Sequence, residues 1–325
     1  MKKLALAACA ALTLSAGASS AADLITKARP SAAPPSPPPW DIAFGAAIAS
    51  DYAFRGISQS AEKPSVSAYF EPRYKITPNV ELYAGIAGSS IDFPNRPAAE
   101  VDFYGGVRPT FGKLSLDIGA IYYWYPGGQC FNTVALCNAL GGGNFVAAAL
   151  PNTNVIKSDV SFWEVYGKAS YAVTDAFTIG AAIYYSDSVL NSGADGLFFS
   201  GNAKYTFPAF ANGVQMYVSG EVGHWDLGTS DAFYAVAGFP NGIPYKDYTT
   251  WNLGFGWTWK VFTLDLRYHD TDLNKGDCNA FTSDHTASGT TSITPINPGG
   301  LGSNWCSARF IAKLSADLTV NTSLK

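Results

Sequence analysis

The sequence predicts an all-β protein, a transmembrane antiparallel β-barrel of about twelve strands. Three observations lead to this fold class. Apolar and polar residues alternate with a period of two along most of the chain, which is typical of strands with one apolar face. Charged residues make up 14% of the 325 residues, whereas soluble domains carry about 25%. No apolar run approaches the roughly 18–20 residues that a membrane-spanning helix needs.

The charge and hydropathy of the chain exclude two further classes. Asp and Glu outnumber Lys and Arg by 25 to 21 and no Lys/Arg cluster appears, so a nucleic-acid partner is not expected. Hydrophobic residues make up 47% of the chain, which is too many for a disordered protein.

Residues 1–22 have the pattern of a secretory signal peptide. Lys2 and Lys3 form a positive start, an apolar stretch follows, and small residues permit cleavage after Ala22 or, nearly as well, after Ala21. The string LAAC, which ends at Cys9, resembles a lipoprotein cleavage box. Only eight residues precede this cysteine, which leaves no room for a proper apolar region, so lipidation is not expected. The protein is therefore expected to be exported.

Residues 23–39 are expected to be an extended periplasmic tail, and residues 40–325 to be the barrel. Six of the seventeen tail residues are proline, which cannot join the interior of a sheet or helix. The alternation begins at Trp40. It predicts twelve strands, over residues 40–55, 65–76, 80–93, 100–111, 114–125, 163–173, 177–185, 197–207, 214–225, 251–259, 262–269 and 308–318.

The apolar strand face is expected to contact membrane lipid. In these twelve segments it carries no Lys or Arg, and its only acidic residue is Asp92 at a strand end. Large aromatic residues on this face gather near strand ends, which is typical of the interfacial girdles of outer-membrane barrels rather than of a soluble barrel. These residues are Trp40, Tyr52, Phe54, Tyr74, Trp124, Trp163, Tyr171, Tyr185, Trp251 and Trp259.

The connections between the strands alternate strictly between five short and six long ones. In outer-membrane barrels the short turns face the periplasm and the long loops face outside, so both termini are expected to be periplasmic. Pro72 and Pro109 lie inside predicted strands, where a closed barrel has no free edge, and a bulge is expected at each.

Beyond Cys9, the cysteines occur as two pairs in two long loops. Four cysteines allow three pairings, and pairing within each loop closes the loops most locally. We therefore expect disulfides between Cys130 and Cys137 and between Cys278 and Cys306. Histidine is too scarce near these cysteines for a metal site, and no cofactor is expected.

The strings SDYAFRGISQS (residues 50–60) and KPSVSAYFEPRY (residues 63–74) resemble the opening of the TorF-type porins, a family of bacterial outer-membrane barrels. The resemblance implies a porin in the outer membrane of a Gram-negative cell. Its partners would be outer-membrane lipid and small hydrophilic solutes, which cross by passive diffusion. The sequence does not indicate an oligomeric state.

The inward face of the predicted barrel carries balanced charge, nine positive against nine negative residues, so no ion selectivity is expected. Twelve strands enclose a bore between those of small filled barrels and wide porins, so a small or partly plugged channel is expected. The positive residues are Arg55, Arg73, Lys75, Arg108, Lys168, Lys204, Arg267, Arg309 and Lys313. The negative residues are Asp51, Glu71, Glu81, Glu100, Asp102, Asp117, Glu164, Glu221 and Asp265.

Asp51 and Arg55 lie four residues apart, and so on one face of a predicted strand. Two interpretations stay open for this pair. The two side chains could line a constriction that orients a passing solute, or they could form a structural ion pair that fixes the first hairpin.

Two other functions remain as alternatives to a porin. One is a structural outer-membrane anchor or adhesin with a plugged barrel. The other, a barrel hydrolase, would need a nucleophile with an oriented base, and only Ser307, His269 and Asp265 approach such a set. No GxSxG motif appears, and no catalytic residue is predicted.

Overall fold

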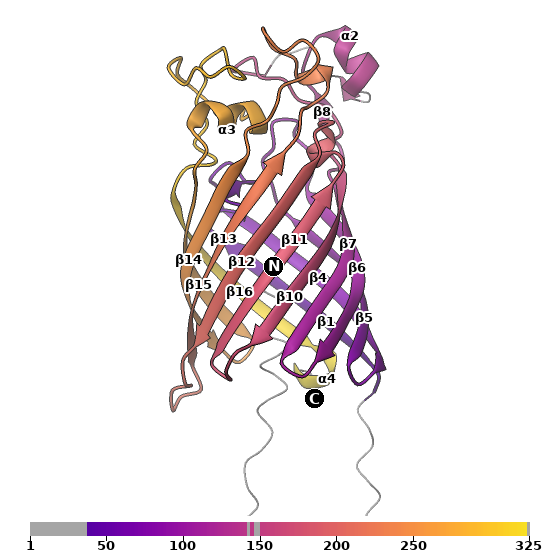
Figure 1. The fold of residues 1–325 in the computed structure, drawn as a ribbon, viewed down its shortest axis with the longest axis vertical. Coiled ribbons are helices and arrows are strands. Elements are labelled where there is room, and N and C mark those ends of the chain that lie inside the picture. The colour runs from indigo at the N-terminus through magenta and orange to yellow at the C-terminus, as the bar shows by residue number, and fades with distance from the viewer. Residues whose placement is uncertain (1–37, 142–143, 146–149, 324–325) are drawn as a thin grey trace, which may run out of the picture. The chain divides into compact units, whose positions relative to one another are not determined.

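A computed structural model describes residues 38–141, 144–145 and 150–323 of the chain. The predicted signal peptide (residues 1–22) and all but the last two residues of the predicted tail (residues 23–39) lie outside the described residues. From Trp40 onward, twelve antiparallel strands close into one barrel, which confirms the predicted fold class (Figure 1).

The barrel strands follow one another around the wall in chain order, and the first pairs with the last. They are β1 (Trp40–Ala49), β4 (Ser65–Thr77), β5 (Val80–Ser89), β6 (Glu100–Phe111), β7 (Leu114–Trp124), β10 (Phe162–Ala172), β11 (Phe177–Ser186), β12 (Gly196–Thr206), β13 (Gln215–Leu227), β14 (Tyr248–Trp259), β15 (Phe262–Thr271) and β16 (Arg309–Thr319).

Short elements occupy the connections between the barrel strands, and one more follows the last strand. They are β2 (Ala53–Phe54), β3 (Ile57–Ser58), β8 (Gln129–Cys130), β9 (Asn144–Phe145), the helices α2 (Val134–Leu136), α3 (Lys275–Thr282) and α4 (Val320–Ser323), and single helical turns at Cys137–Gly141, Val189–Asn191 and Ala232–Tyr234. The long connections, with α2 and α3, lie at one end of the barrel, here called the long-loop end, and α4 lies at the other (Figure 1). None of the helices in the described part of the chain is long and apolar enough to cross a membrane.

The outer surface of the barrel is apolar because the period-two pattern places every second side chain there. On β15, Phe262, Leu264 and Leu266 are 40–47% exposed, whereas the intervening Thr263 and Asp265 are 7% and 4% exposed. Seven of the ten predicted girdle aromatics are exposed large side chains, namely Trp40, Tyr74, Trp124, Trp163, Tyr171, Tyr185 and Trp259. Such a surface matches a lipid environment.

Inside the barrel, tyrosine rings lie over glycines of the neighbouring strand. Tyr217 on β13 faces its register partner Gly256 on β14, and a β-carbon at position 256 would overlap the tyrosine ring. Interior glycines therefore make room for large polar rings, which fill the bore without apolar packing.

Each proline is paired on one side, whereas the ladder on its other side skips residues 71–72 and 108–109 without a change of register. Pro72 pairs with Ile42, and Pro109 pairs with Val80, with no shift of register at either position. The prediction of a bulge at each proline is therefore wrong. The register shift in the β4–β5 pair lies between Lys75 and Thr77, closer to the turn, where a shift disturbs fewer paired residues.

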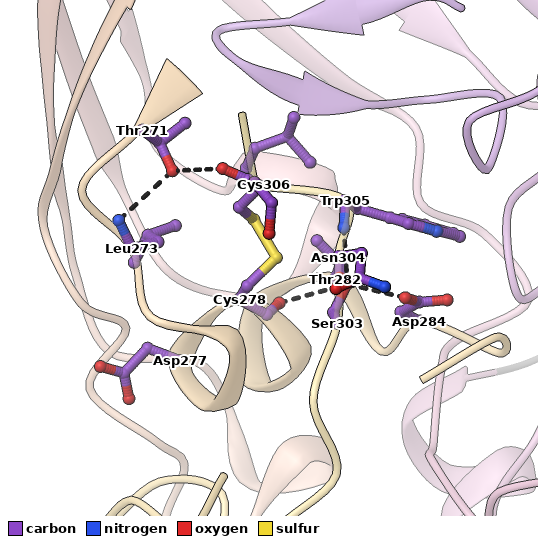
Figure 2. The surroundings of a disulfide bond; sticks show 12 residues. Thr271, Leu273, Asp277, Cys278, Thr282, Asp284, Ser303, Asn304, Trp305 and Cys306 are labelled. Carbon is purple, nitrogen blue, oxygen red and sulfur yellow. Dashed lines mark hydrogen bonds between the residues drawn. A yellow bond between two sulfur atoms is a disulfide. The ribbon is translucent and has the colours of Figure 1, made fainter. Parts of the chain in front are cut away.

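Both predicted disulfides are confirmed. Cys130 is bonded to Cys137 and Cys278 to Cys306, with Cα–Cα distances of 5.8 and 6.0 Å. Figure 2 shows the second bond, which joins α3 to the segment that enters β16, where the Cys306 carbonyl accepts a hydrogen bond from Thr271 Oγ1 on β15. The long loop after β15 is thus tied back to the barrel wall.

We predict that Leu266→Arg lowers the free energy of unfolding by about 2–4 kcal/mol in lipid vesicles, because Leu266 is exposed midway along β15 and arginine is costly on a lipid-facing surface far from the interfaces. The matched control is Phe210→Arg, since Phe210 is 54% exposed but lies in a turn outside the strands. Urea titration of the folded protein measures both variants. Equal losses would contradict the assignment of the outer face to lipid.

We predict that opening the Cys278–Cys306 bond loosens the loop between β15 and β16. A bond that closes about 28 residues restricts the unfolded chain by about 3–4 kcal/mol. The variant Cys278→Ser/Cys306→Ser should therefore be cleaved by protease between residues 272 and 308 much faster than the wild type. Cys130→Ser/Cys137→Ser serves as the control and should leave this loop protected.

Candidate functional site

Residues 50–64 leave the barrel wall and fold into its interior; we call this segment the plug hairpin. The first strand ends at Ala49, six residues earlier than predicted, and β2 pairs with β3 as a separate two-stranded hairpin. The hairpin contacts Glu164 on β10 and Tyr248 on β14, and neither strand is a neighbour of β1. Such contacts can be made only through the interior of the barrel.

A buried ion pair holds the tip of the plug hairpin to the opposite wall. Arg55 Nη1 and Nη2 donate to the two carboxylate oxygens of Glu164 at 2.8 and 2.9 Å, and each side chain is 1% exposed. Burial alone lowers the pKa of Arg55, but the Glu164 carboxylate more than offsets it and the pKa lies above its usual value. The guanidinium is therefore always charged.

Aromatic rings enclose the same guanidinium. Four ring centroids lie 4.2–5.0 Å from Arg55 Cζ, close enough for cation–π attraction. The rings are those of Phe54 on the hairpin and of Tyr184, Phe198 and Trp225 on the barrel wall. The pair is thus dry, which strengthens its attraction and makes the loss of either partner costly.

The turn at the tip needs glycine. Arg55 and Gly56 both have positive φ angles, 49° and 83°, as in the two-residue turns that join tight hairpins. A β-carbon on Gly56 would lie 2.5 Å from Thr271 Cγ2, so the tip touches the wall closely. Tyr248 also donates to the Arg55 carbonyl oxygen at 3.0 Å.

The base of the hairpin is held by Asp51, which does not pair with Arg55. Its carboxylate accepts from Ser58 Oγ at 2.7 Å, from Ser60 Oγ at 2.8 Å and from Arg309 Nη1 at 3.0 Å. The predicted pairing of Asp51 with Arg55 on one strand face is therefore wrong, because the chain turns into the interior after Ala49. Both residues fix the first loop, but each through a distant strand.

Two of the predicted girdle aromatics also belong to the plug hairpin rather than to the outer face. Tyr52 donates to Glu100 Oε1 at 2.6 Å, and Phe54 packs edge-on against Tyr123 and Trp225. Burial and the Glu100 carboxylate raise the pKa of the Tyr52 phenol well above its usual value, so the hydroxyl stays protonated and donates.

Tyrosines accompany the acidic residues of the barrel interior. Five phenols donate to five interior carboxylates, which spreads the negative charge into hydrogen bonds. The pairs are Tyr125 with Glu100 (2.8 Å), Tyr123 with Glu164 (3.2 Å), Tyr217 with Asp265 (2.6 Å), Tyr69 with Asp317 (2.9 Å) and Tyr83 with Asp117. Asp317 was missed by the sequence analysis, although it continues the inward parity of Lys313 along β16.

The predicted inward cations lie against these carboxylates or on tyrosine rings. Arg73 and Arg108 contact Glu71, Arg108 also approaches Glu81 and Asp117, Lys168 approaches Asp117, Arg267 contacts Asp265, and Lys204 lies 4.1 Å above the Tyr217 ring. Asp102, Glu221 and Lys313 are half-buried on β6, β13 and β16, whereas Lys75 is exposed near the short turn after β4.

Exposure divides the interior into two levels. Below the plug hairpin, the side chains of Arg73, Arg108, Glu81 and Lys168 are 13–22% exposed, so water reaches them. Two of the carboxylates that they contact and the Arg267–Asp265 pair are 0–7% exposed. At the hairpin, Arg55 and Glu164 are 1% exposed. The interior is thus partly open to water toward the short-turn end and dry where the hairpin crosses it.

On the long-loop side of the hairpin lies a small apolar pocket of about 50 Å³, lined by aromatic residues that include Phe54, Phe93, Trp225 and Trp305. Rings of the hairpin, the wall and the loops pack against one another around it, as Phe54 does against Trp225 and Phe93 against Tyr125.

The site offers little for hydrolysis. Asp265, which a triad would need to orient His269, accepts hydrogen bonds from Arg267 and Tyr217. Ser307 accepts from Arg309 through its carbonyl oxygen. Among the residues that the structure describes, no cluster of three His, Cys, Asp or Glu side chains could hold a metal ion.

We predict that Glu164→Gln lowers the free energy of unfolding by about 3–5 kcal/mol, because it leaves the buried Arg55 charge without a partner. Asp92→Asn is the matched control, since the Lys63–Asp92 pair is 62% and 35% exposed and its loss should cost at most about 1 kcal/mol. Urea titration in lipid vesicles compares the two. If Glu164→Gln lowered the free energy of unfolding as little as the control does, the Arg55–Glu164 pair would not hold the hairpin in place.

Solved structures with similar folds are outer-membrane barrels. One is an outer membrane channel from Pseudomonas putida F1, with a TM-score of 0.42, 11% sequence identity and coverage of 89% of this chain and 99% of that one. Another is the NanC porin, with a TM-score of 0.39, 8% identity and coverage of 85% and 97%. A third is a loop-deletion mutant of OmpT, an outer membrane protein of Vibrio cholerae, with a TM-score of 0.35, 10% identity and coverage of 86% and 98%. No functional conclusion rests on likenesses this remote.

No curated protein matches the chain significantly. One family model, described as a bacterial protein of unknown function (Gcw_chp), matches residues 32–294, which is most of the chain. The protein belongs to the Gcw_chp family.

Proposed function

We propose that the protein is an outer-membrane channel for small hydrophilic solutes, of the TorF porin type, and that the plug hairpin closes it in the state described here. The observation that carries the proposal is the charged interior below the hairpin, which is partly exposed to water. A barrel that only anchors the protein gains nothing from charged residues in its bore, since buried charges are costly. A solute path needs such residues, because they replace water around a polar solute.

The surface of the barrel supports a place in the outer membrane. The exposed apolar belt and its aromatic side chains suit lipid, with small turns at one end and long loops at the other. By analogy with other outer-membrane barrels, the short turns face the periplasm and the long loops face outside. The plug hairpin then closes the external side, and the hydrated part of the bore opens toward the periplasm.

Passage of a solute requires the tip of the plug hairpin to leave Glu164. Separating a buried ion pair costs about 3–5 kcal/mol, which leaves on the order of 0.1% of the molecules open at any moment. The charges in the bore below the hairpin are mostly paired, as in the contacts of Arg108 with Glu71 and of Arg267 with Asp265, so this part of the channel should discriminate weakly between cations and anions.

One observation favours a second candidate, a permanently plugged anchor. The side chains of the Arg55–Glu164 pair are 1% exposed, and the apolar pocket on the long-loop side of the hairpin has a volume of about 50 Å³. A hairpin held this firmly could stay in place for the life of the protein, and the barrel would then serve to hold the long loops at the cell surface.

A planar-bilayer recording distinguishes the channel from the anchor. We predict rare, brief openings for the wild type and frequent conductance steps for Arg55→Gln/Glu164→Gln, which removes the ion pair without leaving a single buried charge. The matched control, Lys63→Gln/Asp92→Asn, removes an exposed pair and should behave like the wild type. A folded double variant that never conducts would overturn the channel proposal and favour the anchor.

A further inference from the structure

The residues that enclose the Arg55 guanidinium come from four consecutive strands of the barrel wall. Glu164 lies on β10, Tyr184 on β11, Phe198 on β12 and Trp225 on β13. Tyr184 is the register partner of Phe198, and Phe198 is the register partner of Trp225, so the three rings form one row across the wall. We call these four residues the wall cage.

The wall cage and its occupant belong to different parts of the fold. Hydrogen bonds along the strand ladders fix the cage, whereas Arg55 sits at the tip of a hairpin outside the barrel sheet. If the hairpin tip moves away, the carboxylate and the three rings therefore stay in place. They would form an acidic, aromatic-lined site inside the bore.

We propose that the wall cage is a solute-binding site for a guanidinium group, and that Arg55 occupies it in the closed state as a tethered substitute for the solute. This inference rests on the proposed channel function and names its substrate class: small cationic solutes that carry a guanidinium. Such a solute would compete with Arg55 for Glu164 and thereby favour displacement of the plug hairpin.

The geometry of the cage selects a guanidinium over other polar groups. Two parallel N–H···O bonds, at 2.8 and 2.9 Å, match the planar fork of a guanidinium to one carboxylate. The rings of the cage lie 4.2–5.0 Å from the central carbon and attract a cation through their faces. A neutral sugar would leave the Glu164 charge buried and unpaired, which is costly.

Arg55 is also an imperfect occupant. Its Nε–H is buried and finds no acceptor among the residues that the structure describes. A buried donor without a partner weakens the closed state relative to one with every donor bonded. A free guanidinium is not constrained by the hairpin and can adjust its position in the cage.

A free guanidinium solute must compete with the tethered Arg55 side chain for the wall cage, and this competition sets the solute concentration needed for binding. A group held by a short linker acts at an effective concentration in the millimolar range or above. A free solute therefore binds the wild type only weakly, and removal of the Arg55 side chain should reveal much tighter binding. The variant Arg55→Ala, titrated with methylguanidinium chloride, tests this directly.

The titration is made by isothermal calorimetry on folded protein in detergent, so that its result does not depend on conductance. We expect methylguanidinium to bind Arg55→Ala at least tenfold more tightly than the wild type, and urea, a neutral molecule of similar shape, not to bind. Binding should be lost in Arg55→Ala/Glu164→Gln and kept in Arg55→Ala/Asp92→Asn, which removes an exposed carboxylate instead. Equal binding of urea, or binding that survives Glu164→Gln, would overturn the proposal.

Hydrogen exchange of the wild type supplies a second measurement if Arg55→Ala does not fold. Methylguanidinium should speed amide exchange in residues 50–64 several-fold more than the same concentration of urea, because it releases the hairpin tip. Equal exchange with both compounds would overturn the proposal. The channel proposal and the cage proposal can fail separately. If the protein conducts but does not bind methylguanidinium, the cage proposal is wrong. If it binds methylguanidinium through Glu164 but no variant conducts, the channel proposal is wrong.

Discussion

The ion pair between Arg55 and Glu164 holds the plug hairpin across the bore. It thereby separates the dry level of the interior at the hairpin from the more exposed level below it. It joins a hairpin that enters from β1 to a strand on the other side of the bore, and it carries the hairpin tip across the barrel. Because both side chains are dry, the pair is strong only while it is complete. A closed barrel needs no such brace for its own stability, since its ladders are already continuous. The Arg55–Glu164 pair therefore serves to hold the plug hairpin in the bore rather than to stabilise the barrel wall.

The rest of the interior obeys a related constraint, because most carboxylates in the described part of the narrow bore have a hydrogen-bond or ion-pair partner. Tyrosine hydroxyls and arginines hold the acidic side chains, as at Glu71 with Arg108 and at Asp265 with Tyr217. Glycines on the neighbouring strands make space for the large rings, as at Gly256. This arrangement lowers the desolvation penalty of the charged side chains inside the barrel, and water reaches some of these side chains below the plug hairpin.

Much of this structure could be predicted from the period of the sequence, and the largest failure, the plug hairpin, has one physical cause. Alternation reports an extended strand and its two faces, but not the sheet that the strand joins. The string DYAFR continues the alternation of β1 although it belongs to the hairpin, so Tyr52 and Phe54 were assigned to lipid instead of the bore. The partner of Arg55 lies 109 residues away, beyond the reach of any local spacing rule. Disulfides within one loop were predictable because the short separation itself favours the pairing.

The claim that the plug hairpin closes the channel can be tested by fastening the hairpin covalently. A β-carbon on Gly56 would lie 3.2 Å from Thr250 Cβ, close to the spacing of a disulfide, but also 2.5 Å from Thr271 Cγ2. Gly56→Cys/Thr250→Cys is therefore combined with Thr271→Ser, which removes that methyl group. These changes are placed in Arg55→Gln/Glu164→Gln protein, with the same protein lacking the new cysteines as control, and single channels are recorded before and after a reductant is added. The account predicts a closed channel while the bond is intact and frequent openings once it is reduced, with the control open throughout. Conductance that is the same in both states would contradict it.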